Sequence, residues 1–158
     1  MISEDVKLDF RDVMIVPKSS SLTSRKDVDV EREFVFKNSN RKWKGVPIAV
    51  ANMDTTGTLE MAKRLQGFHI LTCLHKFYTP EQVAAAKLNP DYFAVSCGTS
   101  QREIDRLDDF VSILNPHFIC LDVANGYLDV VIERIRTIHK KYPSITPVSY
   151  THLRAHET

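Results

Sequence analysis

The sequence predicts an α/β protein in which short strands form a parallel sheet and alternate with helices. Its 158 residues, 43% of them hydrophobic and 26% charged, are typical of one globular domain with a sizeable core. From Gly45 onward, four short apolar runs are each followed by a helical pattern of apolar residues. Four such βα units favour parallel strands, because each helix returns the chain to the same end of the sheet.

The first unit begins with the apolar run at residues 46–51. Pro47 cannot donate a ladder hydrogen bond, but it is tolerated near the start of a strand. The helical pattern that follows contains Met61, Ala62 and Leu65 and ends at Gly67. The sequence therefore predicts a strand and a short helix here.

The second unit begins with a strand at residues 70–74 and continues into a strong helix start. Thr79 is the expected N-cap, and Pro80 occupies the first helical position. Gln82 completes a capping box with Thr79. A helix is therefore predicted from Pro80.

The third and fourth units have strands at residues 93–96 and 118–121. Ser100 and Glu103 have capping-box spacing at the start of the third helix. The stripes expected to be buried are Ile104, Leu107, Val111 and Leu114 in the third helix, and Leu128, Val131, Ile132, Ile135 and Ile138 in the fourth.

The segment before the first unit predicts a β-hairpin. Apolar residues 34–36 are followed by a polar stretch at residues 37–42 and then by Trp43. Basic residues are concentrated in this stretch, and a solvated turn is the favoured interpretation. The pattern alone fits two architectures, a small doubly wound sheet or the first half of a (β/α)8 barrel.

Charge and cysteine content exclude several classes of function. Lys plus Arg total 21 and Asp plus Glu total 20, so a net charge of +1 gives no reason to expect a nucleic acid or an anionic membrane as partner. The cysteines, Cys73, Cys97 and Cys120, lack CxxC spacing, so neither a disulfide framework nor a structural zinc site is expected. No secretory signal is recognised and the apolar runs are too short to span a bilayer, which predicts a cytoplasmic protein.

Polar or ionisable residues follow all four predicted strands, which argues for a ligand site at that edge of the sheet. The segments are Asn52-Met53-Asp54-Thr55, His75-Lys76, Cys97-Gly98-Thr99-Ser100 and Asp122-Val123-Ala124-Asn125-Gly126. No GxGxxG or GxxxxGK[ST] motif occurs, so no glycine-rich phosphate loop is present.

Each segment has a structural alternative. Asp54 and Thr55 could cap the next helix, and Cys97 is more simply a small packed residue than a nucleophile. Lys76 suits a phosphate or ribose-phosphate. Asp122 is expected at the mouth of the sheet, where it could accept hydrogen bonds from a ribose hydroxyl or a carboxamide.

Several motifs resemble the IMP dehydrogenase/GMP reductase family of (β/α)8 barrels. They are Leu8-Asp9-Phe10-Arg11-Asp12-Val13, Pro17-Lys18, Ser24-Arg25, Val50-Ala51-Asn52-Met53-Asp54-Thr55, His75-Lys76 and Leu121-Asp122-Val123-Ala124-Asn125-Gly126-Tyr127. The likeness runs from about Val6 to Tyr142 in family-like order and spacing. It implies the first half of a TIM barrel, with four parallel βα units preceded by a hairpin.

The resemblance also implies an activity, the NADPH-dependent reductive deamination of GMP to IMP and ammonia by a homo-oligomer, expected to be a tetramer. Lys76 and Asp122-Val123-Ala124 look like cofactor contacts, and Ser24 and Arg25 look like the pair that reaches a neighbouring subunit's cofactor. The dehydrogenase branch is the alternative. It usually carries a CBS-domain insertion where this chain has only residues 77–92, and a serine-rich motif where Val123 and Ala124 stand.

The family's catalytic cysteine, potassium-binding loop and GMP phosphate loops belong to later strands, so no catalytic residue or metal ligand is assigned here. We expect the chain to be inactive by itself. A non-catalytic α/β nucleotide-binding module is the remaining alternative.

The end of the chain departs from the family. Residues 148–158 resemble the translation of a common transposase sequencing adapter, and we expect the native sequence to end near Thr146. His152 and His156 are therefore not assigned to a metal site. The expected divisions are residues 1–44 for the N-terminal segment and hairpin, 45–146 for the four βα units and 147–158 for a non-native tail.

Overall fold

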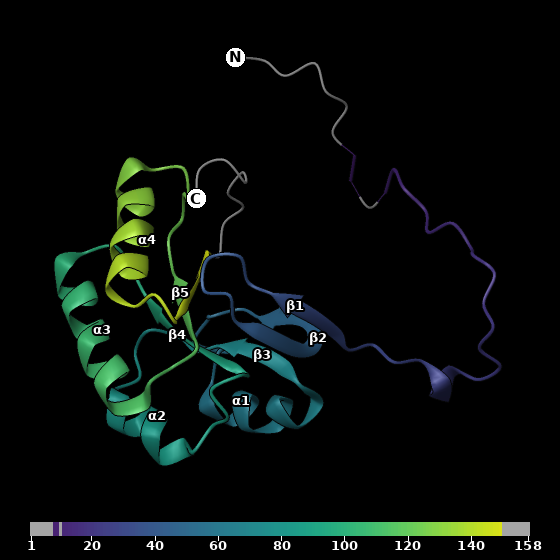
Figure 1. Ribbon diagram of the computed structural model, residues 1–158, viewed down its shortest axis with the longest axis horizontal. Coiled ribbons are helices and arrows are strands. Elements are labelled where there is room, and N and C mark those ends of the chain that lie inside the picture. The colour runs from purple at the N-terminus through teal and green to yellow at the C-terminus, as the bar shows by residue number, and fades with distance from the viewer. Residues whose placement is uncertain (1–7, 10, 150–158) are drawn as a thin grey trace.

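The computed structural model describes residues 8, 9 and 11–149, and its centre is one sheet whose strands follow chain order (Figure 1). The strands are β1 (Arg32–Val35), β2 (Lys42–Val50), β3 (Ile70–Cys73), β4 (Phe93–Cys97), β5 (Phe118–Leu121) and β6 (Thr146–Ser149). β1 pairs antiparallel with β2, and each later strand pairs parallel with its predecessor. A doubly wound sheet reverses its strand order at a switch point, so the strictly sequential order identifies the partial barrel.

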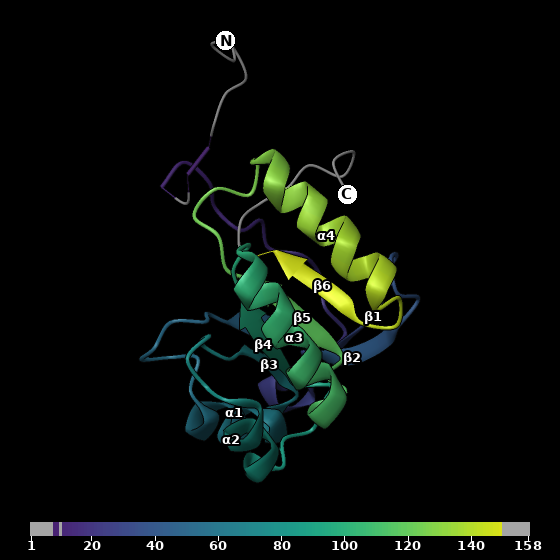
Figure 2. The same cartoon turned by 90° about the vertical axis from the view of Figure 1, so that its left-hand side faces the viewer.

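Helices cover one face of this sheet (Figures 1 and 2). They are α1 (Leu59–Leu65), α2 (Pro80–Ala86), α3 (Gln101–Leu114) and α4 (Asp129–Lys141), with 3-10 turns η1 (Arg25–Asp27) and η2 (Gln66–Phe68). Alternate strand residues divide the core into two clusters. Val95 and Ile119 belong to the cluster with the helices, whereas Ala94 and Phe118 belong to the cluster on the opposite face.

The predicted hairpin is confirmed. Phe34 of β1 lies opposite Trp43 of β2, and Phe36 packs edge-on against Phe118 with 5.4 Å between ring centroids. Parallel pairing with β3 begins at Val46, as predicted, but the same strand also includes the second arm of the hairpin, because β2 starts at Lys42 and pairs there with β1. Pro47 therefore lies inside the strand, at an irregularity where it need not donate to the ladder.

Helix starts follow the predicted chemistry with two corrections. The Thr79–Gln82 capping box of α2 is present. Neither Asp54 nor Thr55 caps α1, because the intervening turn places Thr58 at its N-cap. Ser100 caps α3, but the Glu103 carboxylate accepts from the Gly98 N–H and the Ser100 hydroxyl, so it serves the β4–α3 loop.

The buried stripes are largely as predicted. Ile104 and Leu107 of α3, and Val131, Ile135 and Ile138 of α4, are buried. The expectation fails at Leu128, which is half exposed at the N-cap of α4, and misses Phe110, which is buried. Phe110 lies three residues beyond Leu107, so the stripe of α3 is rotated towards it.

A fifth parallel strand, β6, follows the four predicted units. Thr146 to Ser149 pair in register with Phe118 to Leu121. The predicted tail boundary at residue 147 falls inside this strand and stays a prediction, and residues 150–158 lie outside the described part. Within the described residues, no helix has the length and apolar character needed to cross a membrane.

Candidate functional site

The carboxyl ends of β2, β3 and β5 bring polar side chains to one hollow of about 390 Å³. Asn52 and Asp54 follow β2, Lys76 follows β3, and Asp122 follows β5. Met53 and Phe77 contribute apolar surface to the same hollow. The carboxyl edge of parallel strands is where barrel enzymes bind their ligands, so this hollow is the candidate site.

Lys76 is the only cation lining this hollow in the described part of the chain, and it faces two carboxylates. Its Nζ lies 3.6 Å from an Asp122 oxygen and 3.9 Å from a Glu103 oxygen. All three side chains are partly exposed, so these ion pairs add little to stability. The arrangement leaves Lys76 and Asp122 available to a ligand.

The pKa of Glu103 reflects opposing effects. Partial burial alone would raise this pKa, but the hydrogen bonds from Ser100 and Gly98, together with the charge of Lys76, leave it below its ordinary value. Glu103 is therefore ionised at neutral pH and helps to hold Lys76 at the strand end.

Asp122 is fixed by the sheet itself. Its N–H donates to the carbonyl of Cys97, the last residue of β4, at 2.8 Å, which extends the β4–β5 ladder one residue beyond β5. Val123 then packs against the helix-side core, whereas Ala124 is exposed. The three residues assigned together by the resemblance thus have different surroundings, with Asp122 turned to the hollow.

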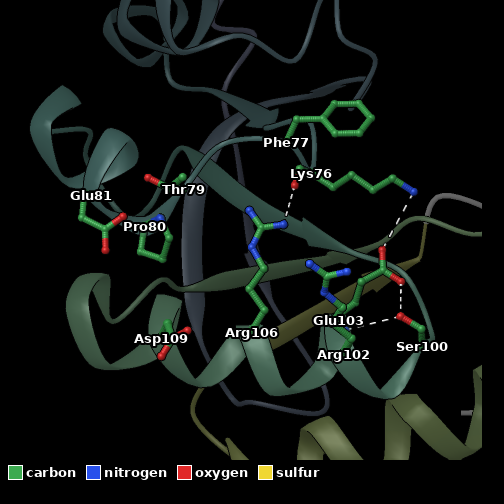
Figure 3. A pocket seen from close by; sticks show the side chains of 10 residues that line it. All are labelled: Lys76, Phe77, Thr79, Pro80, Glu81, Ser100, Arg102, Glu103, Arg106 and Asp109. Atoms are coloured by element: carbon green, nitrogen blue, oxygen red, sulfur yellow. Dashed lines mark hydrogen bonds and ion pairs between the residues drawn. The ribbon is translucent and has the colours of Figure 1, made fainter.

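Arg106 of α3 clamps the loop that carries Lys76. Its guanidinium donates to the Lys76 carbonyl at 2.8 Å and to the Tyr78 carbonyl, and it lies 5.2 Å from the centre of the Phe110 ring. Figure 3 shows Arg106 reaching from α3 towards this loop, across a second hollow of about 820 Å³. The clamp connects the position of Lys76 to a buried part of α3.

Replacing Arg106 with Ala is expected to loosen residues 76–78. A charge-assisted hydrogen bond contributes about 1.5–3 kcal/mol, so even the loss of one of the two should make local opening about 10- to 100-fold more frequent. Amide hydrogen exchange of this loop measures the change. Arg102→Ala is the matched control, because Arg102 lines the same hollow without a hydrogen bond to residues 76–78 in the described part. Equal exchange in both variants would contradict the clamp.

Ser24 and Arg25 line neither of the two hollows at this edge. They belong to the exposed η1 turn in the segment that runs away from the sheet in Figure 1. The Ser24 hydroxyl accepts from the Lys26 N–H and caps that turn. This chain therefore does not bring Ser24 and Arg25 to its own Lys76 and Asp122, and their expected role towards a neighbouring subunit stays a prediction.

Burial argues against a nucleophilic role for the cysteines. Burial, reinforced by the nearby Glu103 carboxylate, raises the pKa of Cys97 to about 12. The hydrogen bond between Cys73 and Cys120 raises the pKa of Cys73 and lowers that of Cys120, whose thiol is nevertheless fully buried. All three thiols are free and buried, which agrees with Cys97 as a packed residue.

His75 also has a structural explanation. Its ring stacks on Tyr78 with 4.0 Å between centroids, and its Nδ1 accepts from the Phe77 N–H. Among the described residues, no group of three His, Cys, Asp or Glu side chains has the arrangement of a metal site.

Two residues that hold Lys76 at the site, Glu103 and Arg106, belong to α3 and were not predicted from the strand ends. Glu103 carried a signal, since an acid three residues after Ser100 can turn back towards the preceding strand. Arg106 carried no such signal, because its partners are backbone carbonyls of a distant loop, and the Lys76 carbonyl is 30 positions away in the sequence.

A sequential parallel sheet with helices on one face and charged side chains at its carboxyl edge defines part of a (β/α)8 barrel, with the candidate site at its mouth. The family description "IMP dehydrogenase / GMP reductase domain" matches residues 7–150. The chain belongs to this family.

Known relatives agree with this assignment. The chain is 46% identical over 156 residues to a GMP reductase of Phytophthora infestans, covering 94% of this chain and 42% of the relative. It is 46% identical over 152 residues to a GMP reductase of Salmonella newport, covering 92% and 44%. A crystal structure of inosine 5'-monophosphate dehydrogenase from Legionella pneumophila superposes with a TM-score of 0.71 at 25% identity, covering 90% of this chain and 43% of that one. The chain thus spans less than half the length of these relatives.

Proposed function

We propose that this chain is the cofactor-side half of an oxidoreductase of purine nucleotide metabolism, which reduces GMP to IMP and ammonia with NADPH. The observation that carries the proposal is the Lys76–Asp122 pair at the carboxyl edge of the sheet, in a chain 46% identical to GMP reductases. The complete protein would be a homo-oligomer acting in the cytoplasm, and potassium binding would belong to its other half.

The residues at the hollow fit such a cofactor. Asp122 can accept hydrogen bonds from a ribose hydroxyl or a carboxamide, and Lys76 can approach a ribose-phosphate. Met53 and Phe77 offer apolar surface to a planar ring. NADPH would supply the hydride, while these side chains bind and orient it beside GMP.

The test uses a longer protein in which this chain is continued to the length of its relatives. GMP-dependent loss of NADPH absorbance, with release of ammonia, is the expected activity. Lys76→Ala or Asp122→Ala should raise the KM for NADPH about 10-fold or more, because a charge-assisted contact of about 1.5–3 kcal/mol is lost. The KM for GMP should change much less. Lys63→Ala, at an exposed lysine of α1, is the control.

Two outcomes would contradict the proposal. IMP-dependent reduction of NAD without reduction of GMP would identify a dehydrogenase, the branch that the 25% identical neighbour represents. Nucleotide binding without any turnover would identify a binding module. The higher identity to GMP reductases favours the reductase over both.

A further inference from the structure

Asn52 holds a buried polar group that has no partner in the described part of the chain. Its side chain follows β2 directly and is only 8% exposed. The Nδ2 atom is buried and has no hydrogen-bond partner among the described residues. Buried donors are nearly always paired in folded proteins, so an unpaired one needs an explanation.

The neighbouring backbone fixes Asn52 where it is. The turn that follows is closed by the Gly57 N–H, which donates to the Met53 carbonyl at 2.7 Å. An added Cβ at Gly57 would lie 2.9 Å from the Asn52 Cα, so the glycine packs directly against this residue. The turn therefore holds the Asn52 backbone in place at the end of β2.

The place of Asn52 points to a ligand. It lines the same 390 Å³ hollow as Lys76 and Asp122. We propose that the Asn52 amide is a further ligand-binding group of this site, and that its N–H donates to a carbonyl oxygen on a planar heteroaromatic ring. This inference rests on the proposed function, since it concerns the same hollow.

Charge and polarity beside Asn52 favour that ligand chemistry over an anion at this position. Asp54 and Asp122 outnumber Lys76 among the charged groups lining it, and Lys76 already faces Asp122 and Glu103. A phosphate beside Asn52 would meet two carboxylates. A neutral carbonyl needs only the donor, and Met53 and Phe77 can contact the ring that carries it.

Two carbonyl groups on the ligands of the proposed reaction have this chemistry. They are the carboxamide attached to the nicotinamide ring and the 6-oxo group of the purine. Affinities in the longer protein distinguish them. NADP⁺ is compared with 2′-phospho-ADP-ribose, which lacks the nicotinamide ring. GMP is compared with 2-aminopurine riboside 5′-monophosphate, which lacks the 6-oxo group.

Asn52→Leu, of similar size and without the donor, should weaken one carbonyl-bearing ligand about 10-fold while leaving its truncated analogue unchanged. The ligand that weakens identifies the carbonyl. The thermal midpoint of the ligand-free variant should stay the same or rise, because no buried donor is left unpaired. Asn52→Ala should show the same selectivity, and Asn38→Ala, at an exposed asparagine of the β1–β2 turn, should show none.

The inference would be overturned if the Asn52→Leu variant bound each of the four ligands as tightly as the wild type does. It would also be overturned if the variant lost affinity equally for a ligand and its truncated analogue. A lower thermal midpoint without selectivity would show a structural role instead. These affinities are measured by calorimetry without turnover. A wild-type protein that fails to reduce GMP would therefore count against the proposed function, whereas an unselective Asn52 variant of an active protein would count only against this inference.

Discussion

The 158-residue chain alone is expected to show no GMP-dependent oxidation of NADPH, whereas the longer protein regains it. The resemblance implies a covalent cysteine adduct, and a nucleophile needs an accessible thiol with a nearby base. Cys73, Cys97 and Cys120 are all buried, and the pKa of Cys97 is raised to about 12. Loss of an essential nucleophile lowers turnover by about 10⁴-fold or more, which is below detection in an absorbance assay.

A second reason lies in the sheet face opposite the helices. Its apolar hollow of about 200 Å³ is lined by Phe34, Phe36, Trp43, Pro47, Ile48, Ala49 and Leu71, and Ile48 is 57% exposed. An uncovered apolar face and open strand edges favour aggregation of the isolated chain. Size-exclusion chromatography should accompany the assay. Turnover by a purified monomeric chain, abolished in its Lys76→Ala variant to exclude contamination, would contradict both the assignment of roles and the need for the longer protein.

Much of the fold could be predicted because its signals are local. The Thr79–Gln82 box needs only four consecutive residues, and each parallel strand is a short apolar run. The order of strands is a property of the whole sheet, so the apolar runs alone could not distinguish a doubly wound sheet from a half barrel. The continuity of the hairpin arm with the first parallel strand was not predicted, because Lys42 and Lys44 look like turn residues until β1 pairs with them.

The site was predictable only where it follows the strands. Lys76 and Asp122 come directly after β3 and β5, so the parallel topology brings them to one edge. Glu103 and Arg106 reach that edge from a helix, and their partners depend on how α3 packs. The unpaired amide of Asn52 could not be predicted, because burial and pairing of one atom depend on the complete surroundings.

The turn that supports Asn52 depends on a glycine at position 57. Its backbone N–H donates to the Met53 carbonyl, and its carbonyl accepts from the His75 N–H at 2.9 Å, so it joins the ends of β2 and β3. A Cβ there would lie 2.4 Å from the Cys73 carbonyl oxygen and 3.0 Å from the Ala51 carbonyl oxygen. Both neighbours are backbone atoms and cannot move without shifting the strand ends.

Gly57→Ala is therefore expected to destabilise the longer protein by about 1–3 kcal/mol, the usual effect of overpacking a tight site. Because the shift displaces Asn52 and the loop before Lys76, NADPH affinity should fall with it. Gly67→Ala is the matched control, since a Cβ at Gly67 meets nothing within 4 Å. That change should be neutral or stabilise by up to about 1 kcal/mol, through a less flexible unfolded chain. Thermal unfolding with and without NADPH measures both effects, and equal midpoints for the two variants would show that the close approach at Gly57 does not hold the site together.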